Sequence, residues 1–118
     1  MFIYIIWEGL KIKTEEVIKI SKALSEKNRV EIIKLLSDEE ICACKLLEHF
    51  DIKQPTLSHH MKILSETGLV NVSKKSTWSY YTLNKEKLKE FKDFLDDCMN
   101  EKYSLTTANC GCKKESEK

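Results

Sequence analysis

The chain has 118 residues, a length typical of one domain, which excludes two full domains. Hydrophobic residues make up 42% and charged residues 33%, with one proline and three glycines. This composition excludes collagen-like, low-complexity and disordered classes and predicts a mostly α fold. The net charge of +1 gives no argument for nucleic acid, but residues 51–83 carry four basic and two acidic side chains. The basic excess therefore lies in the middle of the chain.

The first residues do not indicate a targeting or membrane segment. The run FIYIIW, residues 2–7, lacks a preceding basic region and a following small-residue cleavage site. It is also far shorter than the roughly 20 residues that span a bilayer. We therefore expect a cytoplasmic protein without a membrane partner, with residues 1–13 as an N-terminal extension. In that compartment five cysteines indicate metal or redox chemistry before disulfides.

Three helices are predicted in the first half of a domain that spans residues 14–101. The first, 14–24, begins with Thr14 as its cap and an acidic first turn, and its inward stripe is Val17, Ile20, Ser21 and Leu24. The second, 26–36, places at core spacing either Val30, Ile33 and Leu36 or Ile32 and Leu36. The third is short, 44–50, and turns Leu46, Leu47 and Phe50 inward before a turn at 51–53.

A fourth helix and a hairpin follow. Residues 54–67 hold Pro55 in the first turn, Gly68 ends the helix, and Leu57, Met61 and Leu64 recur at helical spacing. The β-prone runs 70–72 and 80–83 flank a polar stretch, 73–79, which predicts a small β-hairpin wing.

The last predicted helix, 85–101, carries an apolar stripe wider than one small core needs. Its members are Leu88, Phe91, Leu95 and Cys98, widened by Phe94 and Met99. Residues 102–118 form a polar tail without periodicity, which we expect to be flexible.

A short helix, a turn and a longer helix make a helix-turn-helix, whose second helix enters the major groove of DNA. The apolar stripe of helix 54–67 leaves hydrogen-bonding side chains on the opposite face, although a merely solvated face has the same composition. Arg29 is the sole arginine, so other residue types must read the bases. His49 and His60 are predicted to be packing or surface groups. The predicted DNA-contacting residues are Gln54, Thr56, Ser58, His59, Lys62, and Lys74 and Lys75 of the wing.

The run QPTLSHHMKILSETGLV and the following KKSTWSYYTLN resemble the recognition helix and wing of the ArsR/SmtB family of winged-helix repressors. The run ICACKLLEHF resembles the ELCVCDL box of its arsenic sensors, and the likeness covers about residues 15–100. The resemblance implies a homodimeric winged helix-turn-helix joined by its first and last helices. It also implies binding to double-stranded operator DNA without a cofactor, and repression of a resistance operon that a thiophilic ion relieves.

Cys42 and Cys44 form a C-x-C pair. Inside a helix, residues two apart point about 200° away from each other and cannot hold one ion, so binding must disturb the helix start. In register with the family, Cys42 falls near the N-cap of the short helix and Cys44 in its opening turn, where N–H groups favour thiolate. We therefore expect a bound ion to distort this turn, re-aim the recognition helix and lower operator affinity.

The C-x-C spacing differs from the C-x₂₋₄-C of structural zinc sites, and soft thiolates suit soft ions. The resemblance implies As(III) or Sb(III) held by three thiolates, but Leu47 stands where many such sensors supply the third. Cys110 or Cys112, flanking the flexible Gly111, is favoured over Cys98 as the third ligand, from the same or the partner subunit. The alternative is a tail with incidental thiols. The family's zinc site on the last helix is not supported, because no histidine lies beyond residue 60.

Other functions remain open at this point. Cys42, Cys44, Cys110 and Cys112 supply four sulfurs, enough for a tetrahedral Cd(II), Pb(II) or Zn(II) site. Paired thiols also suit a repressor that senses peroxide or persulfide. A thiol-based metal chaperone or redox enzyme would use C-x-C without DNA. No phosphate loop, H-E-x-x-H or G-x-S-x-G motif is present, so we do not expect an enzyme.

Overall fold

Helix α2 (Thr14–Ala23) opens the part of the chain that the computed structural model describes, residues 12–100. Thr14 was expected as the cap, but Lys13 occupies the N-cap position, because its extended backbone N–H donates to Oε1 of Glu16 over 3.0 Å. Ser21, expected on the inward stripe, is exposed and donates its hydroxyl to a carbonyl of its own helix. The buried residues of α2 are Ile20 and Ala23.

Helix α3 (Lys27–Leu36) begins one residue later than predicted, because the Glu26 carboxylate accepts the backbone N–H of Arg29 and so takes the N-cap position. Its buried residues are Ile32 and Leu36, whereas Val30 is 37% exposed. Of the two predicted core registers, the second is confirmed.

The predicted helix-turn-helix is present as α4 (Ala43–His49) and α5 (Gln54–Glu66), each within one or two residues of its expected bounds. Pro55 lies in the first turn of α5, where backbone N–H groups have no partner within the helix, so the missing N–H of proline costs no hydrogen bond. Gly68 ends the segment with φ +85°, the left-handed conformation that glycine adopts without strain.

The wing is larger than the predicted hairpin. Strands β2 (Val70–Lys75) and β3 (Trp78–Leu83) pair antiparallel with Lys75 opposite Trp78, so only two residues form the turn where seven were expected. A third strand, β1 (Ile41–Cys42), pairs with the other edge of β3 and gives the order β1-β3-β2. The prediction missed β1 because two residues carry no periodicity and the strand exists only through its pairing with β3.

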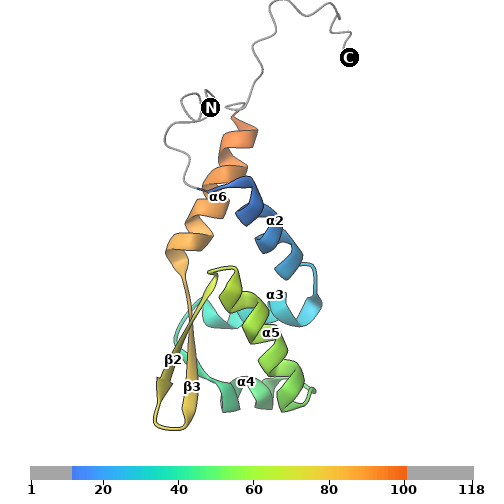
Figure 1. Cartoon of the computed structure of the whole chain (residues 1–118), viewed down its shortest axis with the longest axis vertical. Helices are drawn as coiled ribbons and strands as arrows, with labels where there is room; N and C mark the ends of the chain where they lie inside the picture. The colour runs from blue at the N-terminus through green and yellow to red at the C-terminus, as the bar shows by residue number, and fades with distance from the viewer. Residues whose placement is uncertain (1–11, 101–118) are drawn as a thin grey trace, which may run out of the picture.

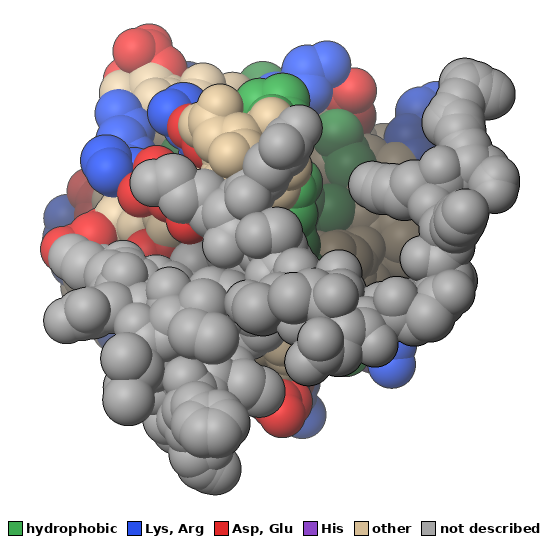
Figure 2. All heavy atoms as spheres, turned by 90° about the horizontal axis from the view of Figure 1, so that it is seen from above, with side chains coloured by type: hydrophobic (Ala, Val, Ile, Leu, Met, Phe, Trp, Pro, Cys, Tyr) green, Lys and Arg blue, Asp and Glu red, His purple; other side chains and the backbone are tan. Residues whose placement is uncertain are grey.

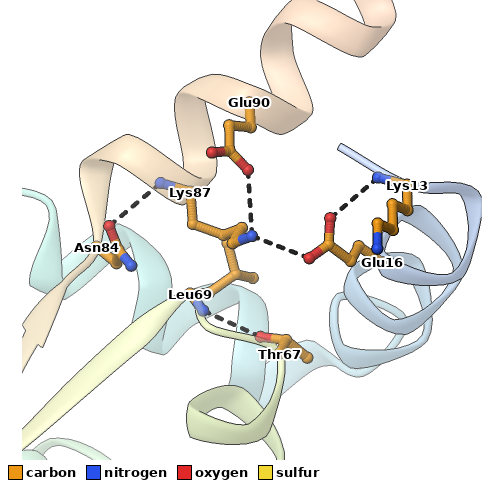
Figure 3. Close-up of polar contacts among 7 residues, drawn as sticks. All are labelled: Lys13, Glu16, Thr67, Leu69, Asn84, Lys87 and Glu90. Atoms are coloured by element: carbon orange, nitrogen blue, oxygen red, sulfur yellow. Dashed lines mark hydrogen bonds and ion pairs between the residues drawn. The ribbon is translucent and has the colours of Figure 1, made fainter. Parts of the chain in front are cut away.

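Helix α6 (Lys85–Met99) is fixed to the rest of the fold by Lys87 (Figure 3). Its Nζ lies 3.3 Å from Oε2 of Glu16 on α2 and 3.1 Å from Oε1 of Glu90 on α6. The hydrogen bond with Glu90, helped by Glu16, raises the pKa of Lys87. Asn84 caps the helix by accepting the backbone N–H of Lys87.

Figure 1 shows α2 and α6 side by side at one end of the described molecule, with α4, α5 and the hairpin at the other. Seen from the α2–α6 end, acidic and basic side chains are interspersed (Figure 2). Within residues 12–100, no helix is long and apolar enough to cross a membrane. The predicted ligands Cys110 and Cys112, with most of the predicted extension and tail, lie outside the described residues.

The helices and the sheet share one hydrophobic core. Its buried residues are Ile12, Ile20, Ala23, Ile32, Leu36, Leu46, Leu57, Met61, Leu64, Leu69, Val70 and Tyr81.

Candidate nucleic-acid interface and thiol site

Helix α5 has the two faces that the sequence predicts. Leu57, Met61 and Leu64 are buried against the core, with exposed fractions of 2% or less. The opposite face is polar and available to a partner, since its five predicted DNA-contacting side chains are all exposed: Gln54, Thr56, Ser58, His59 and Lys62.

The remaining histidine of α5 points inward and is held by the sole arginine. Arg29 donates through Nε to the carbonyl oxygen of Ala23 over 2.7 Å, and its Nη1 lies 3.0 Å from Nδ1 of His60. A guanidinium only donates, so Nδ1 must accept and the imidazole is neutral. Burial lowers the pKa of His60, which agrees with this assignment. Arg29 is therefore an internal group, and of the two roles predicted for His60, packing or surface, the structure shows packing.

In the wing, both predicted phosphate contacts are exposed, but Lys75 already has partners. Its Nζ lies 3.0 Å from Oε1 of Glu40 and 4.7 Å from the centre of the Tyr80 ring. Lys74 lies beside it on β2. Glu40 is a residue that sequence reasoning missed, because it is 35 positions from Lys75 and only the sheet brings the two together.

The two cysteines of the C-x-C pair meet at the start of α4. Cys42 is the N-cap residue, with an extended backbone (φ −80°, ψ 158°), and also the last residue of β1, opposite Tyr80. Cys44 lies in the first turn of α4, and the two Sγ atoms are 2.7 Å apart. The positions implied by the family register, Cys42 at the N-cap and Cys44 in the opening turn, are those found. The 200° separation of helix-interior residues does not apply, because the extended backbone of Cys42 brings the two sulfurs together. That a bound ion distorts this turn stays a prediction.

The contact shifts the pKa values of the two thiols in opposite directions. The pKa of Cys42 is lowered, mainly because the Cys44 thiol donates a hydrogen bond to its sulfur, with the Lys45 backbone N–H adding to the effect. The pKa of Cys44 is raised, mainly because the same contact holds its proton. The contact therefore favours the thiolate form at Cys42 over Cys44.

A cavity of about 210 Å³ opens beside Cys44, between α4, the first turns of α5 and the tip of the wing. The cavity is lined by Cys44, by Gln54 and Ser58, which are predicted DNA-contacting residues of α5, and by Trp78 of β3. Sequence reasoning did not single out Trp78, because an aromatic residue at a strand end gives no signal of its own. Its 52% exposure places part of the ring at the surface.

The described residues do not supply a complete ion site. Within 12–100, no group of three or more His, Cys, Asp or Glu side chains is arranged to hold an ion. Cys98 is exposed in the last turn of α6, at the end of the molecule opposite α4 (Figure 1).

Comparison with known proteins decides the family. A family model described as bacterial regulatory protein, arsR family, matches residues 26–72, from the cap of α3 into β2. The arsenical resistance operon repressor of Staphylococcus aureus is 44% identical over 101 residues, covering 84% of this chain and 90% of that protein. The chain belongs to the ArsR family of bacterial regulatory proteins. Membership makes it a DNA-binding transcriptional repressor and not an enzyme, as the sequence predicted.

Solved structures confirm the winged helix-turn-helix fold of this ArsR-family chain. A crystal structure of an ArsR family transcriptional regulator matches with a TM-score of 0.71 at 21% identity, covering 80% of this chain and 98% of that one. The solution structure of a homodimeric winged helix-turn-helix DNA-binding domain from Mycobacterium bovis matches with a TM-score of 0.59 at 21% identity, covering 78% and 89%.

Proposed function

We propose that this ArsR-family repressor controls a metalloid-resistance operon and leaves its operator when As(III) or Sb(III) binds the thiolates of Cys42 and Cys44. The observation that carries the proposal is the Sγ–Sγ contact of 2.7 Å, which presents two soft ligands side by side next to the recognition helix. The 44% identity to a protein named arsenical resistance operon repressor supports the choice of ion.

The exposed face of α5 supplies base and phosphate contacts, and the wing lysines supply phosphate contacts in this proposal. Gln54, with its amide, suits an adenine edge, whereas Lys62 suits a phosphate or a guanine edge. Thr56, Ser58 and His59 add hydrogen bonds on the same face. Phosphate contacts by Lys74 and Lys75 make operator binding steeply salt-dependent, because each one releases counterions.

In this proposal, ion binding affects DNA binding through β1 and α4, the two elements that Cys42 connects. Two thiolates bonded to one ion at about 2.3 Å, with an S–ion–S angle of about 90° or more, stand at least about 3.3 Å apart, so a contact of 2.7 Å must widen by roughly 0.6 Å or more. The movement displaces either the end of β1, which pairs with the wing strand, or the first turn of α4. A coupling of about 1 to 3 kcal/mol suffices for 5- to 150-fold weaker DNA binding.

The third sulfur of the ion site is Cys110 or Cys112 in this proposal, from the same or the partner subunit. The distance of Cys98 from α4 within one chain supports the same choice (Figure 1). Cys98→Ser should therefore keep the response to arsenite, whereas the double variant Cys110→Ser/Cys112→Ser should weaken it.

The proposed assembly is a homodimer joined through α2 and α6. Large apolar side chains remain exposed on these two helices within one chain, at 49% for Ile18, 46% for Leu95 and 72% for Met99. Burying such a surface against a second copy removes apolar area from water. The homodimeric state of the Mycobacterium bovis domain supports this arrangement.

A mobility shift on a DNA duplex from upstream of the chain's own gene tests the proposal. Arsenite and antimonite should release the wild-type protein, and Cys42→Ser should need at least about tenfold more arsenite for half release. A response of Cys42→Ser equal to wild type contradicts the proposal. Release by cadmium, lead or zinc at lower concentration than arsenite favours the four-sulfur alternative.

The same thiol contact favours a second candidate, a thiol-redox switch. Peroxide would oxidise the two thiols to a disulfide and be reduced to two waters. Release of the operator by peroxide or persulfide without any metal ion, reversed by a dithiol reductant, selects this function. No release under these conditions excludes it.

A further inference from the structure

The ammonium group of Lys75, a predicted phosphate contact of the wing, is already bound to an acidic side chain. Its Nζ lies 3.0 Å from Oε1 of Glu40 and 4.7 Å from the centre of the Tyr80 ring. Both contacts hold the ammonium by its positive charge, one as an ion pair and the other as a cation–π contact. Lys75 therefore approaches DNA as a cation that already has an anionic partner.

The sheet brings the two charges together from its opposite edges. Lys75 lies on β2, Tyr80 lies on the central strand β3, and Glu40 directly precedes β1. Lys75 is paired in register with Trp78, and Tyr80 lies two residues further along β3, on the same face of the sheet. The Lys75 side chain thus reaches across β3 to a residue 35 positions earlier in the chain.

The ion pair is open to solvent, so a DNA phosphate can reach it. The side chains of Lys75 and Glu40 are 56% and 36% exposed. A phosphate oxygen and a carboxylate oxygen accept the same charge-assisted hydrogen bond from an ammonium group. Because both acceptors are anions, they repel each other when they approach one ammonium group closely. Phosphate binding at Lys75 must therefore displace or weaken the contact with Glu40.

We propose that Glu40 is an internal competitor of the DNA phosphate at Lys75 and thereby lowers the affinity of the repressor for DNA. The inference rests on the proposed function, because it assumes that Lys75 contacts a phosphate. An exposed ion pair changes an equilibrium constant by at most about fivefold, and the proposed homodimer carries two such pairs. The effect does not depend on base sequence, because a phosphate contact does not read the bases.

Fluorescence anisotropy of two labelled duplexes tests the proposal, one from upstream of the chain's own gene and one of equal length and unrelated sequence. Glu40→Gln keeps the size and polarity of the side chain but removes its charge. It should bind both duplexes about three- to tenfold more tightly than wild type. Equal or weaker binding overturns the proposal, because Glu40 would then either not compete or instead hold Lys75 in place for the phosphate.

Glu39→Gln is the matched control, because it removes the same charge from the neighbouring exposed residue. It should change the affinity for either duplex by less than about twofold, since salt screens a charge that makes no direct contact with the phosphate or its ligand. A gain as large as that of Glu40→Gln overturns the proposal, because net charge would then explain both results.

A double-mutant cycle tests whether Glu40 acts through Lys75. In a Lys75→Gln background, Glu40→Gln should change the affinity by less than about twofold, because the cation for which carboxylate and phosphate compete is gone. A full gain in that background overturns the proposal. Circular dichroism verifies that each variant folds.

The same measurements separate this inference from the proposed function. Lys75→Gln alone should weaken binding to both duplexes and reduce the dependence of affinity on salt, as the loss of a phosphate contact requires. If it does so but Glu40→Gln binds no more tightly than wild type, the inference is wrong and the proposed phosphate contact stands. If Lys75→Gln binds like wild type, the proposed contact is wrong and the inference fails with it.

Discussion

Cys42 and Cys44 form a pair of unequal thiols, and the inequality follows from their backbone positions. Cys42 is extended at the end of β1, Cys44 is helical, and the 2.7 Å contact between their sulfurs lowers the pKa of one and raises that of the other. The lowered pKa of Cys42 increases its thiolate fraction and so favours its reaction with a soft electrophile.

The first prediction concerns that inequality. Cys44→Ala removes the hydrogen bond that lowers the pKa of Cys42, so Cys42 should react several-fold more slowly with iodoacetamide near neutral pH. Mass spectrometry of the labelled peptides measures the rate. Cys44→Ser keeps a hydroxyl donor at this position and should retain most of the rate. Equal rates in wild type and Cys44→Ala would show that the contact does not control reactivity.

The second prediction concerns His60, which faces Glu26, Arg29 and His59. Burial lowers its folded-state pKa below the unfolded value of about 6.5, so the unfolded chain binds the proton more readily. The stability that neutral His60 supports is present above about pH 6.5 and declines as pH falls toward the folded-state pKa. Each unit by which the folded-state pKa is lowered corresponds to about 1.4 kcal/mol in the free energy of unfolding.

Urea unfolding of wild type and His60→Gln at pH values above and below 6.5 measures this effect. Glutamine can accept the Arg29 hydrogen bond but does not titrate. Wild type should therefore lose more free energy of unfolding on acidification than His60→Gln. An identical loss in both proteins would contradict a neutral, buried His60.

At the scale of elements, the success of sequence reasoning follows the strength of the local pattern. Helix α5 was predictable because Leu57, Met61 and Leu64 repeat over about two turns and Gly68 marks the end. The strand β1 was not, because two residues become a strand only through β3.

The candidate site follows the same rule. The exposed face of α5 follows from the position of its buried stripe, and the cysteine pair is evident as a motif. The proximity of the sulfurs depends on the extended backbone at Cys42, and the cavity depends on how the wing packs beside α5. Both features arise from tertiary structure, which no local pattern records.

The third prediction concerns the junction between α5 and β2. A Cβ at Gly68 would lie 3.2 Å from Cε of Lys87, and its φ of +85° strains any residue with a side chain. Gly68→Ala should lower the free energy of unfolding by about 1 to 2 kcal/mol. Gly68→Asn should cost less, because asparagine tolerates this conformation better. Urea unfolding compares the two, and a neutral Gly68→Ala would contradict the conformation described.

At the scale of the whole molecule, the proposed dimer helices α2 and α6 lie at one end of the described structure, and α4, α5 and the hairpin lie at the other (Figure 1). The proposed dimer would therefore set the spacing of two recognition helices without covering either. Helix-turn-helix dimers bind half-sites about one helical turn of DNA apart, so affinity depends on both subunits.

The fourth prediction tests that dependence. Leu95→Glu places a charge in the proposed interface and should shift the sedimentation profile toward monomer, with operator affinity lower by at least about tenfold. Lys89→Glu is the matched control on the same helix, where the side chain is exposed and pairs with Asp93. It should leave the dimer intact. A dimeric Leu95→Glu protein with unchanged affinity would contradict the proposed interface.

The central claim is that binding of a toxic metalloid to cysteine thiolates weakens the binding of this repressor to DNA. Fluorescence anisotropy of a labelled operator duplex, bound to wild type or to a variant with all five cysteines replaced by serine, tests it most directly. Added arsenite should release the wild-type protein and leave the cysteine-free variant on the DNA across the same concentration range. Release of the cysteine-free variant at the same arsenite concentration as wild type would contradict the claim.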